Sequence, residues 1–114
     1  MNKVFANDPF ARVCKYFKLL YGKKYICLLK EHLEDENAET VYGMTSFPQE
    51  GSSACAVPVI FISAELTVKN AVEILAHELA HVAVGHSEGH GEAWEKAFEA
   101  IHRAYMTGKI DAGA

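Results

Sequence analysis

Hydrophobic positions in residues 68–84 recur at three- and four-residue steps, which is the spacing of an amphipathic helix. The apolar side chains gather on one side of the helical wheel, opposite His77. Thr67 precedes the run as a good N-cap, and Gly85 follows it, where glycine permits a left-handed turn. The pattern therefore predicts a helix over 68–84 with an apolar back and a histidine-bearing front.

Two other segments show helical spacing, one before and one after this helix. Residues 8–21 begin with Asp8 as a cap and Pro9 in the first turn. The last helix is predicted to begin near Gly91 and to stop at Gly108. Its core-facing stripe consists of Trp94, Ala97, Phe98, Ile101 and Tyr105.

Short apolar runs between the helices predict three strands, at about 25–29, 41–47 and 57–63. The acidic residues of 31–39 predict an exposed loop. A helix, a small three-stranded sheet and two further helices, in this order, predict an α+β fold. The 114 residues leave room for one core, so we expect a single domain over residues 1–114.

Composition narrows the cellular setting. Half of the residues are apolar, yet no apolar stretch approaches the roughly 20 residues that cross a bilayer, so no membrane partner is expected. The first residues lack the apolar segment of a secretion signal. The three cysteines form no CxxC pair, which favours buried free thiols in a reducing compartment. We therefore expect a cytoplasmic protein.

The charge pattern bears on nucleic-acid binding. A net charge of −4 argues against a dominant nucleic-acid surface. Residues 12–30 nevertheless contain basic side chains and no acidic one, so a local basic face is compatible with a DNA partner. The solvated side of an amphipathic helix explains the same residues and is the favoured interpretation.

A metal-site motif, His77-Glu78-Leu79-Ala80-His81, lies within the predicted central helix. Positions four apart in a helix are about 40° apart on the wheel, so His77 and His81 can reach one metal ion. Glu78 is turned too far round to be a natural third ligand, but it can contact a metal-bound water. This HExxH pattern is the signature of zinc-dependent hydrolases, in which the glutamate is the general base.

The third ligand must come from beyond this helix. His90, at the start of the last helix, is the favoured ligand because a tight return loop would bring it to the metal. His86 is a rival, and it could instead be a loop or substrate-side histidine. Glu73, one turn before His77, could orient a ligand or line the cleft. The remaining alternatives for the third ligand are glutamates: Glu92, Glu95 and Glu99.

Several runs together resemble the SprT-like metalloprotease domain. They are 41–47, 59–63, the HELAH sequence at 77–81, and His90-Gly91-x-x-Trp94. The domain occurs in bacterial SprT-type proteins and in Spartan, the eukaryotic protease of DNA–protein crosslinks. The motif-bearing part covers about 41–108, and no C-terminal zinc ribbon of four cysteines is expected here.

The resemblance implies a zincin-like fold and a zinc-dependent endopeptidase. It assigns zinc binding to His77, His81 and His90, and the catalytic base to Glu78. By the same resemblance, the strand at 59–63 is expected to be the edge strand along the cleft, where an extended peptide could pair with it. Protein or peptide substrates are therefore expected, including proteins associated with DNA.

Two other functions stay open at this point. The first is a regulatory metallopeptidase resembling the ImmA/IrrE group, which a ligand set of two histidines and a glutamate would favour. The second is a non-enzymatic module that binds zinc, which a closed four-ligand site would favour. An intact Glu78 argues against the second, because a structural zinc site does not use a base.

Overall fold

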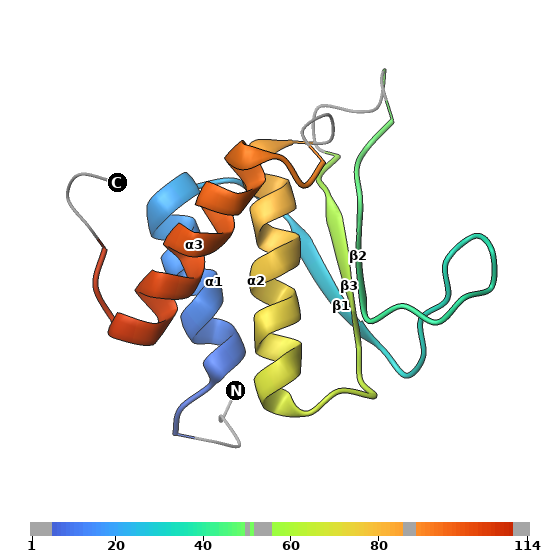
Figure 1. Ribbon diagram of the computed structural model, residues 1–114, viewed down its shortest axis with the longest axis horizontal. Helices are drawn as coiled ribbons and strands as arrows, with labels where there is room; N and C mark the ends of the chain where they lie inside the picture. The colour runs from blue at the N-terminus through green and yellow to red at the C-terminus, as the bar shows by residue number, and fades with distance from the viewer. Residues whose placement is uncertain (1–5, 50, 52–55, 86–88, 111–114) are drawn as a thin grey trace.

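In the part of the chain that the structure describes, residues 6–49, 51, 56–85 and 89–110, three helices lie on one side of a small mixed sheet (Figure 1). This is the arrangement in the computed structural model of the protein. The order of elements is α1 (Pro9–Tyr21), β1 (Ile26–Lys30), β2 (Gly43–Ser46), β3 (Val59–Ser63), α2 (Val68–Val84) and α3 (Glu92–Thr107). The predicted α+β class and the predicted order of elements are confirmed.

The helix ends follow the capping residues in the sequence. The Asp8 carboxylate accepts hydrogen bonds from two backbone N–H groups of the first turn of α1, at 3.0 and 3.2 Å. The Thr67 hydroxyl caps α2 in the same way, at 3.2 Å. Gly108 ends α3 in the left-handed conformation, with φ 72°. Gly85 differs from the prediction, because its φ of 94° comes with a ψ of 169°, outside the left-handed helical region.

The strand order is β1-β3-β2, so β3 is the central strand. It pairs with β1 in parallel and with β2 in antiparallel fashion. The prediction that 59–63 is an edge strand is therefore wrong. The reason for the central position is burial: Ile60 and Ile62 are 0% and 1% exposed, and a strand lies on either side of this most buried strand. The edge strand that contacts α2 is β2 instead.

Helix α2 lies between the sheet and the other two helices, and it contacts β2, β3, α1 and α3. More of the surface of α2 is therefore buried than the single apolar face that the hydrophobic pattern predicted. Small side chains on the additional sides permit this close packing, because alanine lets neighbouring backbones approach. The buried residues of α2 are Ala71, Val72, Leu75, Ala76, Glu78, Leu79, Ala80, Val82 and Ala83.

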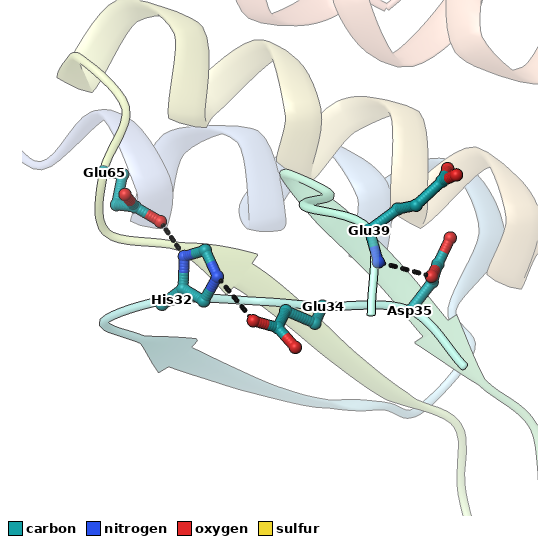
Figure 2. Close-up of polar contacts among 5 residues, drawn as sticks. All are labelled: His32, Glu34, Asp35, Glu39 and Glu65. Atoms are coloured by element: carbon teal, nitrogen blue, oxygen red, sulfur yellow. Dashed lines mark hydrogen bonds and ion pairs between the residues drawn. The ribbon is translucent and has the colours of Figure 1, made fainter. Parts of the chain in front are cut away.

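The acidic segment after β1 forms an exposed loop, as predicted (Figure 2). His32 joins this loop to the turn before α2, with Nδ1 2.5 Å from Glu65 and Nε2 3.2 Å from Glu34. The Asp35 carboxylate accepts a hydrogen bond from the backbone N–H of Glu39 at 3.0 Å. The first of these contacts fixes the loop relative to β3 and α2, and the last fixes the turn within it.

Cysteine placement departs from the prediction of buried thiols. Cys14 in α1 is half-buried, but Cys27 is exposed, because all five residues of β1 are exposed at the edge of the sheet. Both of these thiols are free. Cys55 lies outside the described residues. Among the described helices, none is long and apolar enough to cross a membrane.

Candidate metal centre

Three histidine side chains meet at the C-terminal half of α2. His77 and His81 come from successive turns of that helix, and His90 comes from the segment just before α3. The Nε2 atom of His90 is 2.9 Å from Nε2 of His81 and 3.2 Å from Nε2 of His77. The structure thus brings together the three histidines that the motifs singled out.

The glutamate alternatives for the third ligand lie elsewhere on α3. Among the described residues, the one group of three or more metal-ligating side chains with atoms within 4.8 Å of one another is His77, His81 and His90. Glu92, Glu95 and Glu99 are exposed on α3. The other alternative, His86, lies outside the described residues.

The spacing of the nitrogens fits a small tetrahedral metal ion. Zinc lies about 2.0–2.1 Å from histidine nitrogens, so two such ligands in tetrahedral geometry are about 3.3 Å apart. The observed separations of 2.9 and 3.2 Å are close to this value. The donor type and these two separations therefore fit zinc, and all three ligand atoms lie within 4.8 Å of one another.

Burial keeps the helix histidines in the form that binds metal. Desolvation, followed by the charge of His90, lowers the pKa of His77. Desolvation, followed by the charges of His77 and His90, lowers the pKa of His81 to about 4. Both rings are then neutral near pH 7, and a neutral imidazole offers the lone pair that a metal ion needs.

Trp94 packs against all three histidine rings, from the first turn of α3. Its ring centroid lies 4.7 Å from that of His77, 5.6 Å from that of His81 and 4.8 Å from that of His90. Its indole N–H donates a hydrogen bond to the backbone carbonyl of His77 at 3.1 Å. The stripe of α3 predicted Trp94 as a core residue, and the structure places it beside the candidate ligands as well.

Glu78 is buried next to the histidines, with 6% of its surface exposed. One carboxylate oxygen, Oε2, lies 3.9 Å from Nε2 of His77. The other, Oε1, accepts a hydrogen bond from the Thr45 hydroxyl at 2.7 Å. Burial raises the pKa of Glu78, while the Thr45 hydrogen bond and the charge of His90 act in the opposite direction.

A hollow of about 360 Å³ adjoins the histidines on the side of His77. Glu73, one turn before His77, is exposed and forms part of its wall. Tyr105, a predicted core residue of α3, is partly buried against the core, and its ring centroid lies 5.5 Å from the Arg12 guanidinium of α1. The residues that line the hollow are Tyr42, Leu66, Asn70, Glu73, Ile74, His77 and Phe98.

Two residues of β2 also contact the site, and the sequence did not single them out. The Thr45 hydroxyl donates a hydrogen bond to the Glu78 carboxylate, and Gly43 lies so close to Ile74 and Glu78 of α2 that it leaves no room for a Cβ atom. They occupy alternate positions of one strand and therefore face the same way. That alternation was the available signal, but it does not reveal which helix residue the strand meets.

No protein-family model matches this chain, and no curated protein and no solved structure matches it either. Membership of the SprT-like family therefore stays a prediction from the motifs. The chemistry of the three histidines and of Glu78 is the ground on which a function can be inferred.

Proposed function

We propose that this chain is a zinc-dependent metallopeptidase, of the SprT-like and zincin-like type, that hydrolyses peptide bonds in proteins. The observation that carries the proposal is the convergence of three imidazole nitrogens beside a buried carboxylate. Catalytic zinc sites typically have three protein ligands and an open fourth position, whereas structural sites are closed by four. His90 is exposed, which is compatible with an open position.

Each site residue has a role in this proposal. His77, His81 and His90 would hold the ion, which supplies a Lewis acid for the scissile carbonyl and lowers the pKa of water to about 7. Glu78 accepts a proton from the attacking water and then delivers it to the leaving amine as the C–N bond breaks. Its burial beside His77 supports this assignment, because a general base must lie within reach of the proton that it takes.

The substrate would lie along β2. This strand is the sheet edge next to α2, and an extended peptide can add a strand to such an edge. The hollow beside His77 would then accept a substrate side chain. The net charge of −4 gives no support to a DNA partner, so the cleavage assay below is run both with and without DNA.

Metal content and protein cleavage test the proposal together. The wild type, Glu78→Gln and His90→Ala are purified, assayed for zinc, and given casein and histones with and without DNA. His102→Ala is the matched control, because His102 is a histidine of α3 that stacks on Phe98 and does not join the cluster. We expect about one zinc ion per chain in the wild type. Glu78→Gln should keep the metal and lose cleavage, His90→Ala should lose the metal, and His102→Ala should lose neither.

Other results would point elsewhere. A wild type that binds zinc but cleaves nothing under any condition would favour a non-enzymatic zinc-binding module. A His90→Ala variant that keeps its zinc would move the third ligand to His86 or to a glutamate. A wild type that binds no metal would leave the three histidines as a helix surface, and the proposal would fail.

A further inference from the structure

Glu78 is anchored to the sheet through one of its two carboxylate oxygens. The Thr45 hydroxyl donates a hydrogen bond to Oε1 at 2.7 Å, while Oε2 is the oxygen that lies near His77. Thr45 belongs to β2 and Glu78 to α2, so the bond joins two elements through residues that are 33 apart in the chain. The two oxygens of one carboxylate are thus divided between the sheet and the histidine cluster.

The approach of β2 to α2 brings this hydroxyl to the carboxylate. An added Cβ at Gly43 would lie 2.4 Å from Ile74 Cγ2, 3.1 Å from Glu78 Oε2 and 3.3 Å from Glu78 Cγ. Any larger side chain at Gly43 would therefore occupy the space that Ile74 and Glu78 now fill. The Gly43-x-Thr45 spacing puts the tight contact and the hydroxyl on the same face of the strand.

Strand pairing fixes the direction of that face independently. Gly43 is opposite Ile62 and Thr45 is opposite Ile60 in the antiparallel pair of β2 and β3. Ile60 and Ile62 are buried against the helices, and side chains directly opposite each other point to the same side of a sheet. Thr45 consequently faces α2, whereas Ser46, the next residue, faces away.

A glutamate side chain has three rotatable bonds, and its freedom must be removed if it is to act as a base at one position. A hydrogen bond from a hydroxyl to an ionised oxygen is short, strong and directional. The Thr45 bond fixes Oε1, and the remaining oxygen then has a defined direction toward the histidines.

We propose that Thr45 is a positioning residue, whose hydroxyl holds Oε1 of Glu78 so that Oε2 faces the site formed by His77, His81 and His90. This inference rests on the proposed function, in which Glu78 is the general base. Thr45 does not touch the metal ligands in this role, so it should affect the rate of the chemical step without affecting metal binding.

Variants of Thr45 separate a positioning role from a structural one. Thr45→Val keeps the branched shape and removes the hydroxyl, whereas Thr45→Ser keeps the hydroxyl. Thr40→Val, which removes an exposed hydroxyl outside β2, is the control. For Thr45→Val we expect kcat to fall by about tenfold or more. Its KM and zinc content should stay at the wild-type values. Thr45→Ser should restore most of kcat, and Thr40→Val should match the wild type.

Crystal structures of the zinc-loaded variants give a readout that does not depend on activity. We expect the Glu78 carboxylate in one orientation in the wild type and in Thr45→Ser, and in another or in several orientations in Thr45→Val. If Thr45→Val does not fold, Thr45→Ala replaces it in both measurements.

Several results would overturn the inference. They are an unchanged kcat in Thr45→Val, a raised KM as its main effect, or a Thr45→Ser variant as slow as Thr45→Val. If the wild type cleaves no substrate, the proposed function fails while the structures still decide the role of Thr45. An unmoved Glu78 carboxylate in Thr45→Val would then refute it.

Discussion

Replacing Gly43 by alanine tests the close approach of β2 to α2. The new Cβ would lie 2.4 Å from Ile74 Cγ2, whereas carbon atoms in favourable contact are about 3.5–4.0 Å apart. Overpacking of this kind costs about 1–3 kcal/mol. The restricted backbone of alanine in the unfolded chain offsets about 0.4–1 kcal/mol of that. Taking the middle of both ranges, about 2 and about 0.7 kcal/mol, we expect Gly43→Ala to lower the free energy of unfolding by about 1.3 kcal/mol.

Urea unfolding of the chelator-treated protein measures this quantity without a contribution from bound metal. Ile74→Leu removes the Cγ2 methyl group that the new Cβ would meet and conserves the side-chain volume. In that background the cost of Gly43→Ala should fall by about 1 kcal/mol. Ser46→Ala is the control, and it should change the free energy of unfolding by less than about 0.5 kcal/mol. An equal cost in both backgrounds, or no cost at all, would refute the contact.

Two further predictions concern the indole beside the histidines and the loop after β1. Trp94→Phe removes the hydrogen bond to the His77 carbonyl and should lower the free energy of unfolding by about 1 kcal/mol. The zinc affinity of this variant should fall by about tenfold or more. An unchanged zinc affinity in a metal titration would contradict this prediction. The hydrogen bond to Glu65 raises the pKa of His32, and the hydrogen bond to Glu34 acts in the same direction. The stabilising effect of these two contacts is therefore complete below about pH 6.5, the pKa of histidine in the unfolded chain. It is lost as the pH rises through the pKa of His32 in the folded state. The stability difference between the wild type and His32→Gln should therefore shrink in urea unfolding as the pH rises above about 6.5. A difference that grows with pH would contradict the assignment.

Local signals in the sequence were sufficient for the helices. Asp8 and Thr67 cap the N-termini of α1 and α2 as predicted, and Gly108 ends α3 as predicted. Capping depends on residues within one turn, so it can be read from the local sequence. The order of the strands could not be predicted in this way. β3 pairs directly with β1 in the sheet, although β2 comes between them in the sequence. Parallel pairing of segments that are distant in sequence leaves no local signal in either of them.

The residues of the candidate site likewise differ in whether local sequence spacing could relate them. His77, Glu78 and His81 lie on one helix, so helical spacing alone was enough to relate them. His90 was expected from its place after a short loop, and the structure brings it to the other two. Thr45 could not be found, since its contact with Glu78 depends on the register between β2 and β3 and on how the sheet packs against α2.

The three histidines do not depend on the same part of the fold. His77 and His81 keep their spacing for as long as α2 is helical, and α2 lies at the centre of the core. His90 reaches them only while α3 is docked, with Trp94 against the rings. Undocking of α3 would break one ligand contact and leave a two-histidine site, which is a much weaker chelate. Release of a bound ion would then be gated by local opening of α3, and its rate would follow amide hydrogen exchange in that helix rather than global unfolding.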